Sequence, residues 1–371
     1  MLTKSGQFDI SSLVKDGLLH ASPRAHGGLH YLRSIKENTI DFSTNVNPLG
    51  ASQKVIAAVR KNINLISGYP DPDAKELKNA IAEYVELDRE NVVVGNGSNE
   101  LIHLFADAFV GKGDKVVIPM PTFFEYEFAC DKNSANISYV ELKEFLLDSK
   151  QMIDAIDKET KVLFICNPNN PSGMLAERGD VERILDHAYN NGTLVMLDEC
   201  FIEFVDYPEK TSFTKFVREY ENLVVLRTFT KAFGLAGLRV GYCLASKRVS
   251  NILNKAKVPW NVNALAQKAA VAALNDRTYL EKTRNLVKKE KKYLHNSIAK
   301  IKQFKPYRSD TNFFLIKLSA MDSVTLKEKL LKRNILVRDC STFTGMGTDF
   351  VRIAVQRHME NRLLVNALKA I

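Results

Sequence analysis

The chain has few cysteines and no long apolar run. Its five cysteines are an odd number, lie far apart and show no Cys-x-x-Cys spacing, which argues against a disulfide framework and a zinc site. No apolar stretch approaches the ~20 residues needed to cross a bilayer, and residues 1–17 lack the apolar stretch of a secretory signal. We therefore expect a cytoplasmic protein that is not bound to a membrane.

Basic residues are in excess, and the formal net charge is +9. The lysines are nonetheless spread along the sequence, and the densest stretch, residues 282–302, mixes them with Glu290 and with apolar residues at helical spacing. That pattern is typical of a solvated helix face rather than of a nucleic-acid-binding surface. A basic average also suits an enzyme with small anionic substrates, because it attracts them.

Short apolar runs alternate with amphipathic stretches. With 371 residues, of which 45% are hydrophobic, the chain can bury a large core. The runs resemble strands buried on both faces of a sheet, and they lie at residues 92–96, 115–120, 137–142, 161–167, 193–199, 223–229 and 239–245. We expect an α/β domain with a mostly parallel sheet over residues 41–275, and a smaller α+β domain formed by residues 1–40 and 276–371.

Lys231 is the most informative single residue. It follows the hydroxyl pair Thr228 and Thr230 and precedes Arg239 by eight residues. A lysine amine forms a Schiff base with an aldehyde, while threonine hydroxyls and an arginine can bind a phosphate. The segment therefore suits pyridoxal 5'-phosphate, and the alternative is a buried strand followed by an exposed lysine.

Two further segments place polar groups beside strands. In residues 95–100, the backbone around Gly97, Ser98 and Asn99 begins a helix and suits an anion site, although Ser98 or Asn99 could be a plain helix cap. Asp198 follows a buried apolar run, where a carboxylate needs a cationic partner. A protonated pyridine nitrogen would supply that cation, and an arginine is the alternative.

Two other side chains complete the pattern. Phe123 follows an apolar run and could stack on a flat ring, although an isolated phenylalanine is more often part of a core. Asn170, in the turn-rich segment 167–173, can donate an amide hydrogen bond to a ring oxygen. The Asn170–Pro171 bond is a candidate cis peptide. These groups occur in order along the chain, each beside a predicted strand, and ligands bind at such strand ends in open α/β sheets.

On these motifs the chain resembles the aminotransferase class I/II family, the fold-type I pyridoxal-phosphate enzymes. The resemblance implies a seven-stranded, mostly parallel sheet sandwiched by helices. Two branches of the family are similar to different segments. The stretch TKAFGLAGLRVGY (residues 230–242) resembles histidinol-phosphate aminotransferase. The segments 26–28, 41–50, 258–266 and 337–346 resemble threonine-phosphate decarboxylase of cobamide biosynthesis, as does Phe201, where many family aminotransferases have tyrosine.

The resemblance favours decarboxylation of O-phospho-L-threonine or O-phospho-L-serine. Transamination of histidinol phosphate with 2-oxoglutarate is the alternative, and a catalytically idle binding protein is a third possibility. The implied roles are a Schiff base and proton transfer for Lys231, a ring-nitrogen partner in Asp198, a ring-oxygen donor in Asn170 and a ring cover in Phe123. The implied phosphate ligands are Gly97, Ser98, Asn99, Thr228, Thr230, Arg239 and, from the second subunit of a homodimer, Tyr69.

The same resemblance implies four substrate-binding residues. Arg338 and Arg352 would capture anionic groups of a small phosphorylated amino-acid substrate, and the alternative for both is surface charge in strands. His26 and Asn47 match segments of the decarboxylase branch and would line the substrate pocket.

Overall fold

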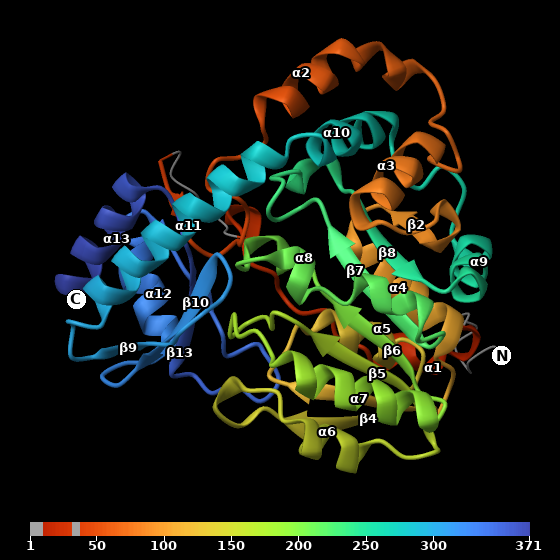
Figure 1. The fold of residues 1–371 in the computed structure, drawn as a ribbon. Coiled ribbons are helices and arrows are strands. Elements are labelled where there is room, and N and C mark those ends of the chain that lie inside the picture. The colour runs from red at the N-terminus through yellow and green to blue at the C-terminus, as the bar shows by residue number, and fades with distance from the viewer. Residues whose placement is uncertain (1–9, 32–37) are drawn as a thin grey trace, which may run out of the picture.

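The computed structural model describes residues 10–31 and 38–371 and contains one large sheet and one small sheet (Figure 1). The large sheet has the strand order β2-β8-β7-β6-β5-β3-β4. Its strands are β2 (Val92–Gly95), β3 (Lys115–Met120), β4 (Asn136–Glu141), β5 (Thr160–Cys166), β6 (Leu194–Asp198), β7 (Leu223–Thr228) and β8 (Gly241–Ala245). All neighbours are parallel except β8, which runs antiparallel to β2 and β7.

These strands coincide with the predicted apolar runs to within two residues at each end, and the mixed, mostly parallel sheet confirms the predicted fold class. The central strands β6 and β7 are almost wholly buried, because helices cover the sheet. Helix α4 packs on β2, β7 and β8, while α7 packs on β6. The helices of this part are α2 (Gln53–Lys61), α3 (Lys75–Val85), α4 (Ser98–Phe109), α5 (Glu125–Asp131), α6 (Ser149–Ala155), α7 (Arg178–Asn190), α8 (Pro208–Thr211), α9 (Lys247–Ala256) and α10 (Ala264–Leu274).

The small sheet is antiparallel, with the order β12-β13-β10-β9, and lies beside the large sheet (Figure 1). Its strands are β9 (Phe304–Pro306), β10 (Phe313–Leu318), β12 (Arg338–Asp339) and β13 (Phe350–Ala354), and its helices are α11 (Arg277–Ile298), α12 (Ser323–Leu331) and α13 (His358–Lys369). A separate two-stranded pair joins β1 (Ile40–Asp41) in parallel to β11 (Ile335–Leu336). Phe42, directly after β1, is fully buried in the apolar cluster of this part.

The N-terminal segment contacts both parts of the molecule. Helix α1 (Asp16–His20) packs on α5, where Gly17 lies so close to the carbonyl of Asp131 that a side chain would collide with it. Arg24 forms an ion pair with Glu127 of α5 and donates to the hydroxyl of Thr344. The division of the chain into a domain over 41–275 and one over 1–40 and 276–371 stays a prediction.

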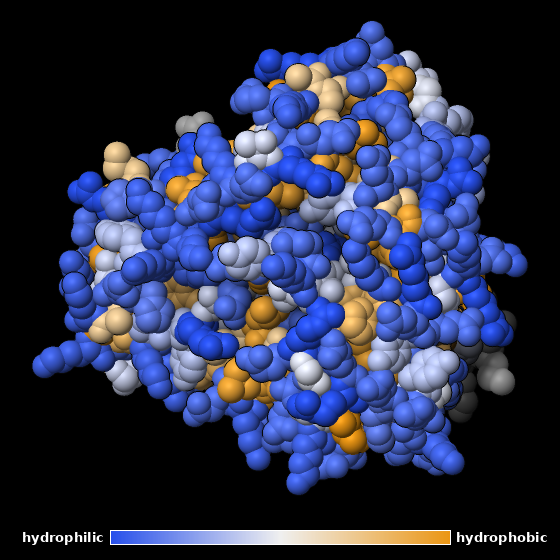
Figure 2. Space-filling view, in the orientation of Figure 1, coloured by the Kyte–Doolittle hydropathy of each residue, from blue (hydrophilic) through white to orange (hydrophobic). Residues whose placement is uncertain are grey.

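In the described part of the chain, no helix is both long and apolar enough to cross a membrane. Hydrophilic residues cover most of the face drawn in Figure 2, and apolar residues appear there only in small groups.

Candidate active site

A cavity of about 330 Å³ lies where β5, β6 and β7 end. Polar side chains gather there because the carboxyl ends of parallel strands meet at one edge of a sheet. Of the side chains predicted from the sequence, its wall contains His26, Ser98, Asn99, Phe123, Asn170, Asp198, Thr230, Lys231, Arg239, Arg338 and Arg352. Residues from both sheets and from the N-terminal segment therefore form one site.

Lys231 lies in the loop after β7, and its amine lies 5.6 Å from the ring centre of Phe201. Burial, followed by the positive charges of Arg352 and Arg239, lowers the pKa of Lys231 to about 8. A larger fraction of this amine is therefore unprotonated at neutral pH than for an ordinary lysine, and the unprotonated form is the nucleophile.

The start of α4 and Arg239 form an anion-binding corner. Gly97 precedes α4 with φ +85°, and a Cβ there would lie 2.3 Å from the guanidinium of Arg239. Arg239 Nη1 in turn donates to the hydroxyl of Thr230 at 3.5 Å, and the Thr230 N–H donates to Thr228 Oγ1 at 3.1 Å. Helix N–H groups, hydroxyls and a guanidinium are the donors that a phosphate prefers.

Asp198, the last residue of β6, is a buried carboxylate. Burial raises its pKa, against the opposing effect of hydrogen bonds from Cys200 and Tyr126. The Tyr126 hydroxyl donates to Oδ2 at 2.6 Å, and the Cys200 N–H donates to Oδ1 at 2.8 Å. Both partners are neutral, and Asp198 has no ion pair with a described residue. A cationic ring nitrogen would therefore supply the partner that a buried carboxylate lacks.

Two arginines lie side by side on neighbouring strands of the small sheet. Arg338 of β12 and Arg352 of β13 are paired in register, and both are buried. Arg352 donates to the side-chain oxygen Oδ1 of Asn170 at 2.5 Å and to the backbone carbonyl of Ser43 at 2.8 Å, so its partners are neutral oxygens. Burial lowers its pKa to about 10, still above neutral pH. Like charges directly opposite each other are unfavourable without an anion, so this pair fits an anionic substrate and not a solvated surface.

The Arg352 bond also fixes the Asn170 side chain. Because the amide oxygen accepts from Arg352, the amide NH₂ group remains as a donor on the cavity wall. The Asn170–Pro171 bond is cis, as predicted.

Phe123 and His26 lie at another part of the wall, with ring centres 6.2 Å apart. The His26 ring is closer to Phe124, at 4.9 Å, and its Nε2 lies 2.9 Å from a carboxylate oxygen of Glu125.

Four predicted site residues do not line the cavity. Gly97 and Thr228 lie directly behind it and contact residues that do. Asn47 is buried and donates to the Ala232 carbonyl and to Thr283, so it holds the loop after Lys231 rather than a substrate. Tyr69 is 86% exposed and lies against Trp260, away from the cavity.

Several residues on the cavity wall, or directly behind it, could not be identified from the sequence. Tyr126 is fully buried in α5, whereas Phe123 precedes that helix, so helical spacing could not have placed both on one face. Glu125 carries no sequence signal either, because its partner His26 is distant in the sequence. Other residues on the wall are Ser43, Asn45, Phe124, Cys166, Cys200, Phe201 and Phe343.

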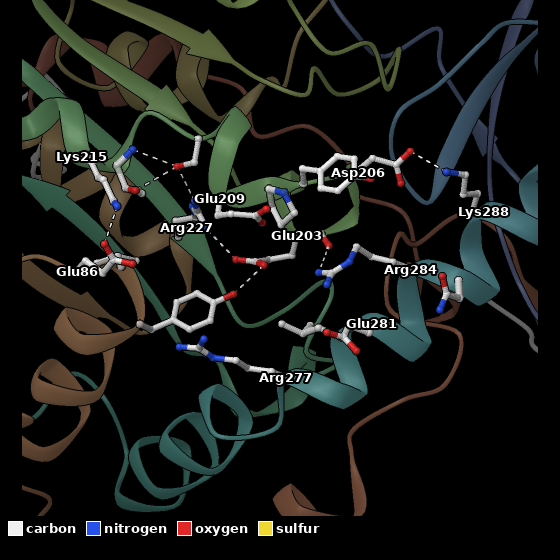
Figure 3. A pocket seen from close by; sticks show the side chains of 18 residues that line it. Glu86, Glu203, Asp206, Glu209, Lys215, Arg227, Arg277, Glu281, Arg284 and Lys288 are labelled. Atoms are coloured by element: carbon white, nitrogen blue, oxygen red, sulfur yellow. Dashed lines mark hydrogen bonds and ion pairs between the residues drawn. The ribbon is translucent and has the colours of Figure 1, made fainter.

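A second, larger cavity of about 730 Å³ lies between α8 and α11 and contains none of the predicted site residues (Figure 3). Its basic side chains already have partners: Lys215 binds Glu86, Lys288 binds Asp206, Arg284 donates to the Glu203 carbonyl, Arg277 lies over the Tyr84 ring and Arg227 binds Glu199 and Glu203. Each of these basic side chains therefore already contacts another residue of the protein.

In the first cavity, by contrast, some buried polar atoms have no partner among the described residues. They are Arg352 Nε, Asn99 Oδ1 and Asn45 Oδ1, all on residues of its wall. Such atoms are costly unless a polar ligand or water satisfies them. Together with the anion corner, the buried carboxylate and the lysine amine, they fit pyridoxal phosphate.

This fold and this site define a pyridoxal-phosphate-dependent enzyme. The family model for aminotransferase class I and II matches residues 37–371, and the chain belongs to that family. Enzymes of this family depend on pyridoxal phosphate, which is therefore the cofactor here.

Relatives in both predicted branches are similar to the chain. A protein of Caldanaerobacter subterraneus subsp. tengcongensis, provisionally named threonine-phosphate decarboxylase, is 40% identical over 94% of each chain. Histidinol-phosphate aminotransferase of Methanocaldococcus jannaschii is 35% identical over 90% of each. The crystal structure of histidinol-phosphate aminotransferase from Clostridium acetobutylicum has a TM-score of 0.83, with 31% identity over 89% of this chain and 98% of that one.

Proposed function

We propose that the protein decarboxylates O-phospho-L-threonine, or O-phospho-L-serine, to the corresponding aminoalkyl phosphate in cobamide biosynthesis. The observation that carries this proposal is the buried apolar ring of Phe201 beside the Lys231 amine. The decarboxylase branch resembles this chain in having phenylalanine there. The decarboxylase-named relative with 40% identity adds support.

Each residue of the cofactor site has a proposed role. Ser98, Asn99, Thr230 and Arg239 hold the cofactor phosphate, with Gly97 and Thr228 behind them. Asp198, fixed by Tyr126, pairs with the ring nitrogen, Asn170 donates to the ring oxygen, and Phe123 covers the ring. When bound, the cofactor supplies an aldehyde for the substrate amine and a cationic ring that accepts the electron pair released at Cα.

Arg338 and Arg352 hold the two anionic groups of the substrate, and His26 lies at the same end. Decarboxylation requires that the Cα–carboxylate bond, and not the Cα–H bond, is aligned with the π system of the cofactor. Two fixed guanidinium groups can impose that orientation, because each binds an anion bidentately. Lys231 then holds or returns the proton at Cα.

We also propose a homodimer with Tyr69 of one subunit at the cofactor phosphate of the other. Exposed apolar residues support this proposal: Trp260 lies against Tyr69, Val258 is near Trp260 in the sequence, and Ile63 and Ile66 are near Tyr69 in the sequence. A neighbouring apolar groove is lined by Val55, Ile56 and Val59 of α2 and by Leu235 and Leu238 of the loop after Lys231. A second copy would bury both.

The alternative is histidinol-phosphate aminotransferase, which the segment 230–242, the relative from M. jannaschii and the C. acetobutylicum structure favour. A catalytically idle protein is disfavoured, because Lys231 and Asp198 both lie in the cavity.

Carbon dioxide release from O-phospho-L-threonine by the cofactor-loaded protein tests the proposal. We expect release by the native protein and none by Lys231→Ala, because that variant lacks the amine. Histidinol phosphate plus 2-oxoglutarate is the parallel assay. Turnover in only that second assay would overturn the decarboxylase in favour of the aminotransferase, and turnover in neither would leave the idle protein.

A further inference from the structure

Glu125, the first residue of α5, is a buried carboxylate behind the cavity wall. Its Oε1 lies 2.9 Å from His26 Nε2, and its Oε2 lies 3.0 Å from His103 Nε2. Burial, which alone would raise the pKa of Glu125, is outweighed by hydrogen bonds from His103, His26 and Asn99, and the pKa is lowered to about 2. The side chain is therefore a permanent negative charge at neutral pH.

The two histidines on this carboxylate differ in position. His103 belongs to α4 and does not line the cavity. His26 instead lines the cavity. Glu125 thus contacts His26, the histidine on the cavity wall that a substrate can reach.

The same end of the cavity carries Arg338. Its guanidinium carbon lies 6.0 Å from the centre of the Phe124 ring, and the His26 ring lies 4.9 Å from that centre. Arg338 and His26 therefore contact one aromatic side chain in common.

Glu125 also bonds to Asn99 at the start of α4, where the cofactor phosphate is proposed to bind. One carboxylate thus contacts both the substrate end and the cofactor end of the cavity.

We propose that Glu125 is a positioning residue that orients the His26 ring beside Arg338 for contact with the phosphate of the substrate. This inference rests on the proposed binding of a phosphorylated amino acid, but it does not depend on which of the two reactions follows. It predicts that Glu125 controls recognition of the phosphate and not the chemical step.

The test compares Glu125→Gln with Glu127→Gln in the cofactor-loaded full-length protein. Glu127 lies on the same helix and contacts Arg24 and Thr344, so it reports on the N-terminal segment without touching His26. We expect Glu125→Gln to raise KM for the phosphorylated substrate about tenfold, as for the loss of one charge-assisted contact, with kcat changed less than about twofold. Calorimetric titration with inorganic phosphate should show weaker binding in Glu125→Gln and not in Glu127→Gln.

A double-mutant cycle separates positioning from general structural support. If Glu125 acts through His26, Glu125→Gln should add little to the KM of His26→Gln. Additive effects, an unchanged KM, or equal effects of Glu125→Gln and Glu127→Gln would overturn the inference. If Glu125→Gln does not fold, His26→Gln carries the test, and an unchanged KM in that variant is the contradicting result.

Failure of the proposed function can be recognised separately. If the native protein turns over only histidinol phosphate, the decarboxylase fails, while the same KM comparison with that phosphorylated substrate still decides the role of Glu125.

Discussion

At Lys231, the surroundings rather than the residue type set the reactivity. The amine is held near the guanidinium groups of Arg352 and Arg239, and with burial they lower its pKa to about 8. The opposite charge of Asp198 raises the pKa, but it is the smallest of these effects.

This environment predicts how cofactor capture depends on pH. Below about pH 8 the protonated amine cannot attack an aldehyde, so the rate at which cofactor-free protein captures pyridoxal phosphate should rise about tenfold per pH unit. Above about pH 8 the rate should level off, and stopped-flow visible absorption measures it. A rate that still rises tenfold between about pH 9 and pH 10 would indicate an ordinary lysine pKa.

Single residues of the site could be predicted where they interrupt an apolar run. Asp198 and Lys231 were recognised because a charged group at the end of a buried strand needs a partner. Tyr126 could not be paired with Asp198 in this way, because their contact depends on the packing of α5 against the sheet. Asn47 lies in a segment similar to a family motif, yet its side-chain amide group donates to Ala232 and Thr283. These contacts are distant in the sequence and depend on the fold.

Among the elements, the start of α4 is the most constrained. Gly97 has φ +85° and leaves room for the Arg239 guanidinium, while Gly241 lies so close that its Cβ would approach the Ser98 nitrogen to 2.6 Å. The end of β2, the start of β8 and the start of α4 thus meet closely, and the close approach depends on these two glycines.

Gly97→Ala should weaken pyridoxal-phosphate binding by at least about tenfold, because the new methyl group displaces the Arg239 guanidinium from the phosphate corner. Gly113→Ala is the matched control, since Gly113 has φ +81° but open space around it. Both variants should lose about 1–3 kcal/mol of stability, because each places a side chain at a positive φ that is unfavourable for residues other than glycine. Absorption titration of the cofactor-free proteins measures the affinity, and equal loss of affinity in both would remove the special role of Gly97.

The sequence predicts the order of the strands along the chain, but it does not predict which strands are neighbours in the sheet. The apolar runs correspond to β2–β8, whereas the antiparallel insertion of β8 between β2 and β7 depends on tertiary packing. The short strands β1, β11 and β12 have two residues each, and a two-residue pattern does not distinguish a strand from a loop.

For the whole molecule, the ion network beside the second cavity stabilises the sheet behind the active site. Arg227 is buried and forms ion pairs with Glu199, which follows Asp198, and with Glu203. Figure 3 shows the Arg227–Glu203 pair, and Glu203 also accepts from the Tyr84 hydroxyl. Arg227 directly precedes Thr228, so the network joins the ends of β6 and β7.

Arg227→Met should destabilise the cofactor-free protein by about 3–5 kcal/mol, because two buried carboxylates lose their cation. Lys215→Met removes a solvent-exposed partner of Glu86 in the same region and should lower stability far less, because exposed ion pairs contribute little. Urea unfolding monitored by circular dichroism gives both values. A loss below about 1 kcal/mol for Arg227→Met would show that the glutamates find other partners or bind protons.

The parallel pairing of β1 with β11 joins residues near the two ends of the chain. During synthesis the cofactor-binding segments, which end at Arg239, emerge from the ribosome well before β11 and β13 do. The residues of the phosphate corner are thus synthesised before Arg338 and Arg352, so a nascent chain can complete the cavity wall only after β12 and β13 have been made.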